Sequence, residues 1–126
     1  MGVLADAQGR VLINQRRSGT HLEGFWEFPG GKLNPGEDPR VGLARELAEE
    51  LGVTVLDAEP LLTLRHDYPG QRVRLDVWRV TRYLGEPSSV EGQPLRWLKP
   101  ADLSQAGLLP ADAPIVETLL SQAWYS

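Results

Sequence analysis

Three glutamates, Glu46, Glu49 and Glu50, are spaced so that an α-helix would place them side by side. Side chains three and four residues apart share a helix face, and like charges there destabilise the helix slightly unless something neutralises them. Hard divalent ions such as Mg²⁺ and Mn²⁺ bind carboxylate oxygens and phosphate oxygens. The trio therefore has two interpretations, a cation site or the solvated face of an amphipathic helix.

The segment that precedes these glutamates, FPGGKLNPGE at residues 28–37, favours the cation site. The adjacent glycines Gly30 and Gly31 permit a close approach of a ligand to the backbone. Lys32 supplies the positive charge that a phosphate needs, and Glu37 comes just before the expected start of the helix. The pattern points to chemistry on a phosphorylated ligand.

The helix that carries the glutamates is predicted over Pro39–Leu51. Asp38 can cap its first turn, proline suits the first helical position, and Gly52 suits the left-handed residue that ends a helix. At about 100° per residue, the apolar side chains share one arc opposite the glutamates. This arc consists of Val41, Leu43, Ala44, Leu47, Ala48 and Leu51.

The remaining pattern predicts a mixed α/β protein. A second helix is expected over Ala113–Trp124, with Asp112 as its N-cap. Val3–Ala5 and Val11–Gln15 flank a turn signal and are expected to form a hairpin. Further strands are predicted at Leu61–Arg65, Val73–Val80 and Leu95–Leu98. Mixed strands and two helices favour an α/β sandwich.

Length and composition limit the possible functions. The chain has 126 residues, 41% of them hydrophobic and 24% charged, which fits one globular domain over residues 1–126. The sequence has no cysteine, so thiol catalysis and thiolate metal sites are excluded. A net charge of −4 argues against a nucleic-acid partner. No apolar run is long enough to span a membrane, so a cytoplasmic location is expected.

The segment from Gly31 to Val53 resembles the signature of the Nudix hydrolase family. Five residues separate Gly31 from Glu37, and seven more lead to Arg45-Glu46-Leu47-Ala48-Glu49-Glu50-Leu51-Gly52-Val53. This matches every defined position of G-x5-E-x7-R-E-U-x-E-E-x-G-U, where U is a bulky aliphatic residue. The similarity to the mutator-type members of the family extends to Gly24–Lys32, Trp78, Gly85–Pro87, Glu91–Pro94 and Pro110–Pro114.

The resemblance implies the Nudix α/β/α sandwich, with a mixed sheet and two main helices, and a Mg²⁺-dependent reaction in which Mn²⁺ substitutes. The implied reaction is hydrolysis of a nucleoside triphosphate to the monophosphate and pyrophosphate, with oxidised guanine nucleotides such as 8-oxo-dGTP as substrates. It also implies the metal ligands, which are Glu46, Glu49, Glu50, Glu91 and the Gly31 carbonyl. The general base is Glu46 or Glu91, and Arg45 is expected to orient Glu37 or Glu49.

For the substrate, the resemblance implies phosphate contacts from Arg16 and Lys32, with Arg17 pointing the other way along the strand. Phe28 is expected to stack on the base and Tyr68 to flank it, while Glu37 lies on the substrate side. Asp112 stands where mutator-type chains have an asparagine. An ionised aspartate accepts hydrogen bonds but donates none, unless burial raises its pKa and keeps it protonated.

Other interpretations remain open at this point. The chain fits a Nudix hydrolase of ADP-ribose or a sugar nucleotide, or a module that binds a nucleotide without cleaving it. A monomer is favoured. The family usually has a longer strand before Val3–Ala5, so the first strand is expected to be trimmed, as in a domain cut from a longer protein.

Overall fold

The computed structural model describes residues 1–68 and 70–122, with backbone alone at His66, Asp67, Tyr68, Gln71 and Val73. The described elements are β1 (Gly2–Leu4), β2 (Val11–Gln15), β3 (Trp26–Glu27), α1 (Pro39–Leu51), β4 (Thr54–Tyr68), β5 (Gln71–Leu84), β6 (Leu95–Leu98) and α2 (Ala113–Ser121). Two 3₁₀ helices, Pro100–Gln105 and Pro110–Asp112, precede α2.

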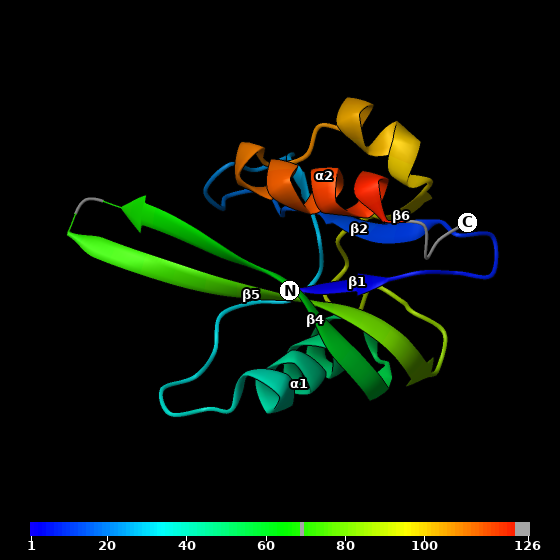
Figure 1. The fold of residues 1–126 in the computed structure, drawn as a ribbon, viewed down its shortest axis with the longest axis horizontal. Helices are drawn as coiled ribbons and strands as arrows, with labels where there is room; N and C mark the ends of the chain where they lie inside the picture. The colour runs from blue at the N-terminus through cyan, green and yellow to red at the C-terminus, as the bar shows by residue number, and fades with distance from the viewer. Residues whose placement is uncertain (69, 123–126) are drawn as a thin grey trace.

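The strands form two three-stranded sheets between the two helices. One sheet has the order β1-β5-β4 and combines a parallel pair with an antiparallel pair, and the other has the order β3-β2-β6. Figure 1 shows α1 on one side of the strands and α2 on the other. The predicted α/β sandwich with mixed strand directions is therefore confirmed.

Helix α1 has the predicted boundaries. The Asp38 side chain accepts hydrogen bonds from the N–H groups of Arg40 and Val41, and Gly52 ends the helix in the left-handed region with φ of 71°. The three leucines of the predicted arc, Leu43, Leu47 and Leu51, are buried. Val41 and Ala48 are exposed, contrary to the prediction, because the helix packs through a narrower stripe that includes Gly42 instead.

The predicted hairpin of the first two strands is wrong. Only the bridge between Ala5 and Val11 joins them. Strand β1 pairs in parallel with β5, where Gly2 lies opposite Trp78, and β2 pairs with β3 and β6. The turn at Asp6 therefore connects a strand of one sheet, β1, to a strand of the other sheet, β2.

Strands β4 and β5 form one long antiparallel hairpin, whose far end projects from the body of the protein (Figure 1). The sequence predicted only the inner segments of this hairpin. Within β5, Val77 is buried, whereas Arg72 and Arg74 are exposed.

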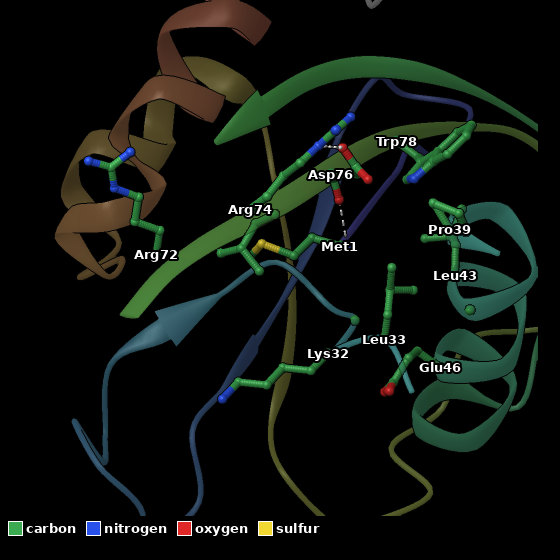
Figure 2. A pocket seen from close by; sticks show the side chains of 14 residues that line it. Met1, Lys32, Leu33, Pro39, Leu43, Glu46, Arg72, Arg74, Asp76 and Trp78 are labelled. Carbon is green, nitrogen blue, oxygen red and sulfur yellow. Dashed lines mark hydrogen bonds and ion pairs between the residues drawn. The ribbon is translucent and has the colours of Figure 1, made fainter. Parts of the chain in front are cut away.

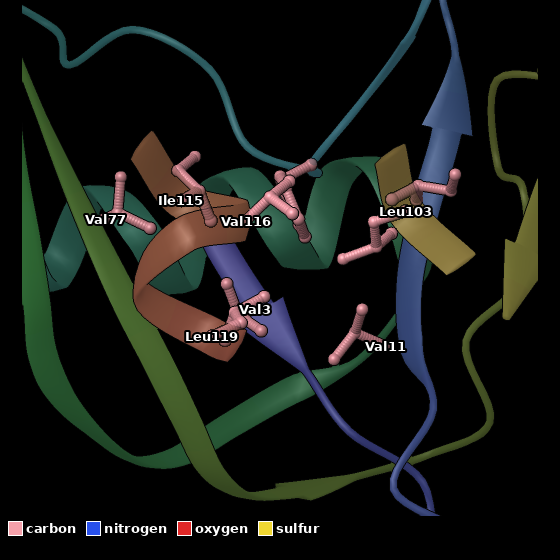
Figure 3. Packing of buried hydrophobic residues seen from close by; sticks show 9 residues of the cluster. Val3, Val11, Val77, Leu103, Ile115, Val116 and Leu119 are labelled. Atoms are coloured by element: carbon pink, nitrogen blue, oxygen red, sulfur yellow. The ribbon is translucent and has the colours of Figure 1, made fainter. Parts of the chain in front are cut away.

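Two hydrophobic clusters lie on either side of the strands. One lies against α2 and includes Val3, Ile13 and Leu119 (Figure 3). The other lies against α1 and includes Leu4 and Leu12. Neighbouring residues of β1 and β2 thus face opposite clusters, as expected for strands buried on both faces.

Helix α2 begins at Ala113 as predicted and ends at Ser121. The predicted extension to Trp124 falls on residues 123 and 124, which lie outside the described residues. Within the described part of the chain, no helix has the length and apolar character needed to cross a membrane.

Candidate active site

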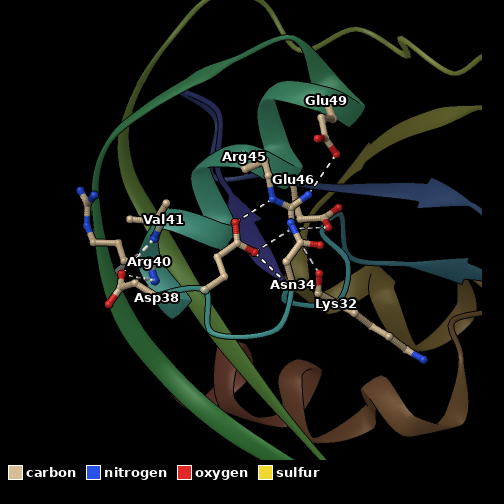
Figure 4. A network of polar contacts seen from close by, with 9 residues as sticks. Lys32, Asn34, Asp38, Arg40, Val41, Arg45, Glu46 and Glu49 are labelled. Atoms are coloured by element: carbon tan, nitrogen blue, oxygen red, sulfur yellow. Dashed lines mark hydrogen bonds and ion pairs between the residues drawn. The ribbon is translucent and has the colours of Figure 1, made fainter.

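The loop between β3 and α1 is fastened to the helix by one ion-pair network, shown in Figure 4. Arg45 Nε donates to Glu37 Oε2 at 2.7 Å and its Nη2 donates to Glu37 Oε1 at 2.9 Å. The Asn34 N–H donates to the same carboxylate at 2.9 Å. These hydrogen bonds lower the pKa of Glu37 to about 2, with those from Arg45 contributing most. The Glu37 carboxylate is therefore committed to holding the loop.

Arg45 also organises the glutamates of its own helix. Its guanidinium lies 3.0 Å from Glu46 Oε1 and 3.2 Å from Glu49 Oε2, and its Nη2 donates to the Lys32 carbonyl at 3.3 Å. The hydrogen bond with Glu37 is the largest cause of its raised pKa, so Arg45 stays charged. Arg45 therefore contacts both Glu37 and Glu49, the two carboxylates that it is predicted to orient.

The two glycines bring the loop against the acidic face of α1. The Gly30 N–H donates to Glu50 Oε2 at 2.7 Å. A Cβ at Gly31 would lie 2.6 Å from Glu46 Oε2, so a larger residue would push the loop away from that carboxylate. The backbone of Gly31 and the Glu46 carboxylate are therefore adjacent, as a shared site requires.

Glu50 is the most perturbed carboxyl group of this face. Burial raises its pKa to about 7, and the negative charges of Glu46, Glu27 and Glu91 act in the same direction. The Gly30 N–H opposes the shift without cancelling it. A desolvated carboxylate among like charges is stabilised by a cation, and perturbed groups of this kind are typical of functional sites.

A cleft of about 150 Å³ joins these carboxylates to basic side chains. Glu27, Glu50 and Glu91 line it together with Arg16 and Arg17. Arg16 Nη1 lies 3.0 Å from Glu27 Oε2, and Arg17 Nη2 lies 3.2 Å from Glu91 Oε2. The prediction that Arg17 points away from Arg16 is wrong, because β2 ends at Gln15 and strand alternation ends with it.

The predicted metal ligands face protein donors. Glu46 and Glu49 contact Arg45, Glu50 accepts from Gly30, and Glu91 contacts Arg17. Among the described residues, no three acidic or histidine side chains converge closely enough to hold a metal ion. The donor set nevertheless fits a hard divalent cation, because all its members offer oxygens and Glu50 lacks compensation for its burial.

Asp112 lies next to Phe28, the residue that follows β3. It is 2% exposed, and its Oδ2 accepts from the Phe28 N–H at 3.4 Å. Burial raises its pKa to about 6. It stands at the N-cap position of α2, but its side chain makes no capping hydrogen bond, so the predicted capping role is wrong.

The predicted aromatic contacts to the base are not both available. The ring of Phe28 is fully buried in the cluster against α2 and offers no face for stacking, contrary to the prediction. Only its backbone N–H reaches Asp112. The side chain of Tyr68 lies outside the described residues.

Lys32 lies apart from Arg16, on a second and larger hollow of about 270 Å³. Figure 2 shows this hollow between the start of α1 and β5, with Glu46 at one side and Arg74 at the other. The structure thus separates the two predicted phosphate contacts, with Lys32 beside the larger hollow and Arg16 in the smaller cleft.

Sequence reasoning missed several residues of the cleft, among them Glu27 and Asn14. Glu27 directly precedes Phe28 in the segment that resembles the family, which was the available signal. Burial raises its pKa although it pairs with Arg16. Asn14 carried no signal beyond its position in a strand.

The NUDIX domain family profile matches residues 1–118, and the chain belongs to this family. Two curated relatives come from Escherichia coli K12. An 8-oxo-dGTP diphosphatase is 33% identical over 94% of this chain and 92% of its own length. A CTP pyrophosphohydrolase is also 33% identical, over 96% of this chain and 90% of its own length.

Solved structures show the same fold. A structure from a study of MutT from Aliivibrio salmonicida and Vibrio cholerae aligns with a TM-score of 0.82 at 33% identity, over 96% of this chain and 92% of that one. The Nudix fold expected from the sequence is confirmed.

Proposed function

We propose that this chain hydrolyses 8-oxo-dGTP to 8-oxo-dGMP and pyrophosphate and so removes an oxidised nucleotide from the nucleotide pool. Water supplies the oxygen of the new P–O bond, and the bond between the α-phosphate and the β-phosphate breaks. The observation that carries the proposal is the half-buried Glu50, which shares a cleft with Glu91 and Arg16 and accepts a hydrogen bond from the Gly30 N–H. The activity of the curated 8-oxo-dGTP diphosphatase, 33% identical over nearly the whole chain, supports the substrate.

The reaction needs a divalent cation, which we propose is Mg²⁺, with Mn²⁺ as a substitute. Glu46, Glu49, Glu50, Glu91 and the Gly31 carbonyl are the proposed ligands. When bound, the cation neutralises phosphate charge and lowers the pKa of a coordinated water. Because Glu50 must lose its proton to act as a ligand, the affinity for Mg²⁺ should rise between pH 6 and pH 8. Calorimetric titration with Mg²⁺ at both pH values, without nucleotide, tests this directly.

The remaining roles belong to side chains around the cleft. Arg16 is held by Glu27 and by the His21 carbonyl in a position from which it can contact a phosphate, and Lys32 offers a second positive charge. Glu46 or Glu91 accepts the proton of the attacking water. Arg45 positions these carboxylates through its contacts with Glu37 and Glu46.

A kinetic panel tests the proposed reaction. The values of kcat/KM are measured for 8-oxo-dGTP, dGTP, CTP and ADP-ribose, with chromatographic identification of the monophosphate and pyrophosphate. The expected result is a preference for 8-oxo-dGTP over dGTP of at least about 100-fold. Equal values for these two would exclude the sanitising role. Failure of wild type and of Glu50→Gln alike to release pyrophosphate would favour a binding module.

A second candidate is hydrolysis of CTP, which one observation and one chemical argument favour. The curated CTP pyrophosphohydrolase is as similar to this chain as the curated 8-oxo-dGTP diphosphatase. Asp112, when ionised, can accept a hydrogen bond from the exocyclic amine of cytosine, and it repels the O6 acceptor of guanine. Asp112→Asn should then shift the kcat/KM ratio from CTP towards 8-oxo-dGTP. An unchanged ratio would remove Asp112 from base recognition.

In either case the substrate is a free nucleotide. We propose that the protein acts on the cytoplasmic pool as a monomer, without a nucleic-acid or membrane partner. Light scattering at assay concentrations tests the monomer, and competition with single-stranded and double-stranded DNA tests the preference for free nucleotides.

A further inference from the structure

Asn14 contains a buried polar atom that lacks a partner. The residue is 4% exposed, and its Oδ1 has no hydrogen-bond donor in the described part of the chain. Buried side-chain acceptors nearly always have a donor. Asn14 also lines the 150 Å³ cleft that contains Glu50 and Arg16. An acceptor of this kind in a cleft points to a ligand that donates a hydrogen bond.

The pairing of β2 determines which way Asn14 faces. Leu12, two residues earlier, faces the cluster against α1, so Asn14 shares that side of the sheet. Asn14 lies directly opposite Glu27 of β3. Directly opposed residues of two strands share a face, so the Asn14 amide and the Glu27 carboxyl are neighbours at the cleft.

The surroundings of Asn14 favour a neutral donor. Glu27, Glu50 and Glu91 add acceptors to the same cleft. The Arg16 guanidinium already donates to the Glu27 carboxylate and to the His21 carbonyl. A hydroxyl group can donate to the Asn14 oxygen without bringing negative charge towards the carboxylates.

The position of the pair identifies which part of a nucleotide it meets. Glu27 shares the cleft with Glu50, and the residue that follows it, Phe28, donates its N–H to the Asp112 carboxyl. Under the proposed function, Asp112 faces the base and Glu50 belongs to the site of the phosphates. The sugar joins the base to the phosphates, so residues between those two sites face the sugar. In a deoxynucleotide, the 3′-hydroxyl is the sugar's only hydrogen-bond donor.

We propose that Asn14 Oδ1 accepts a hydrogen bond from the 3′-hydroxyl of the bound nucleotide, and this inference rests on the proposed function. Asn14 is therefore a specificity-determining residue for the sugar. The cleft would select triphosphates with a free 3′-hydroxyl over analogues that lack it, since a site with an unpaired polar group rejects such analogues strongly.

The test combines one substitution with one missing hydroxyl. The values of kcat/KM are measured for dGTP and its 2′,3′-dideoxy analogue, and for dCTP and its 2′,3′-dideoxy analogue, in wild type and in Asn14→Leu. Wild type should prefer the deoxynucleotide by about tenfold or more. In Asn14→Leu, which replaces the amide by an apolar group of similar size, this ratio should fall to about one. An Asn14→Ala variant repeats the measurement if the leucine variant does not fold.

Gln93→Leu is the matched control. Gln93 lines the same cleft and is also buried, but its Oε1 already accepts from Ser89 Oγ at 3.2 Å. The hydroxyl ratio of Gln93→Leu should stay at the wild-type value, whatever happens to its overall rate. A ratio that stays at the wild-type value in Asn14→Leu would overturn the inference. That result is expected if the Asn14 oxygen binds only water or has only a packing role.

Binding of the monophosphates separates this inference from the proposed function. Calorimetry compares the affinity of wild type and Asn14→Leu for dGMP and for 2′,3′-dideoxy-GMP, which requires no turnover. A preference for dGMP that is lost in Asn14→Leu, in a protein that hydrolyses no triphosphate, would support the inference and contradict the proposed function. If wild type hydrolyses triphosphates but shows no preference for the 3′-hydroxyl, the result would support the proposed function and contradict the inference.

Discussion

Glu37 and Glu50 belong to the same signature, yet the protein moves the pKa of their carboxyl groups in opposite directions. Hydrogen bonds from Arg45 and from the Asn34 N–H lower the pKa of Glu37 to about 2. Burial raises the pKa of Glu50 to about 7, and nearby glutamates add to the shift. In the described chain, Glu50 accepts a hydrogen bond from the Gly30 N–H. Glu37 accepts two hydrogen bonds from the Arg45 guanidinium, one at each carboxylate oxygen.

The difference separates a structural carboxylate from a chemical one. Glu37 has its charge compensated by the protein, so it holds the loop and has little left to offer a ligand. Glu50 is half-buried without equal compensation, so it gains from a cation that the protein does not supply. The Glu37–Arg45 pair fixes the loop from which Gly30 and Gly31 reach Glu50 and Glu46.

The largest expected effect is that of Glu50→Gln. The amide keeps the shape of the side chain and its contact with Gly30, but it removes the charge that would hold the cation. We expect kcat to fall by about 10³-fold or more, as for the loss of several kcal/mol of charge stabilisation. Steady-state release of pyrophosphate measures this.

Folding of this variant should not suffer. A buried carboxyl with a raised pKa loses little stability when a neutral amide replaces it, so thermal unfolding at pH 8 should show an equal or higher Tm. Loss of activity together with loss of folded protein would mean that Glu50 is a structural residue like Glu37. The comparison between the two residues would then fail.

Glu37→Gln tests the other half of the comparison. The loss of charge weakens the fork to Arg45, so the loop should shift and kcat/KM should fall by about 100-fold, as when a residue that orients metal ligands is removed. The midpoint for Mg²⁺ should rise as well. Glu59→Gln, which removes an exposed carboxylate that pairs with Arg79, is the control and should change neither value. Full activity of Glu37→Gln would show that the site does not depend on the ion pair between Glu37 and Arg45.

The sequence predicted local structure better than strand partners. Helix α1 was found with its correct ends because Asp38, Pro39 and Gly52 act within a few residues of the helix termini. The hairpin of the first strands was wrong because β1 pairs with β5, more than half the chain away. A turn signal carries no information about such a distant partner.

The candidate site shows the same division. The loop and α1 are contiguous in sequence, so spacing alone predicted that Gly31 lies near Glu46. Asn14 and Glu27 meet only through the pairing of β2 with β3, a strand of two residues that the pattern did not reveal. Burial of the Phe28 ring depends on packing against α2, which spacing does not encode.

Asp112 extends the comparison of Glu37 with Glu50 to a buried carboxyl group that lies outside the acidic face of α1. Its pKa is raised to about 6 from an ordinary value of 3.8, so the folded protein binds more protons than the unfolded chain between these pH values. The contribution of Asp112 to stability should therefore be greatest below about pH 4 and be lost as the pH rises through 6. Asp112→Asn removes this titration and should be more stable than wild type by on the order of 3 kcal/mol at pH 8, a factor of about 150.

Chemical denaturation of both proteins at pH 4 and pH 8 measures the difference. At pH 4 the two should differ little, because Asp112 is then mostly protonated in the folded state. A constant difference at both pH values would assign the effect to packing rather than to ionisation.

Substitution of Glu49 should give the smallest effect. It tests how far a glutamate of the signature must be buried to act chemically, as Glu50 does, rather than structurally, as Glu37 does. Its side chain is 57% exposed and lies 3.2 Å from Arg45 Nη1, so water already solvates its charge. Although the sequence places it among the metal ligands, an exposed carboxylate gains less from a cation than a desolvated one. We expect Glu49→Gln to lower kcat by about threefold and to leave the pH dependence of Mg²⁺ affinity unchanged. A loss comparable to that of Glu50→Gln would mean that bound metal, rather than burial in the free protein, decides which glutamates carry the reaction.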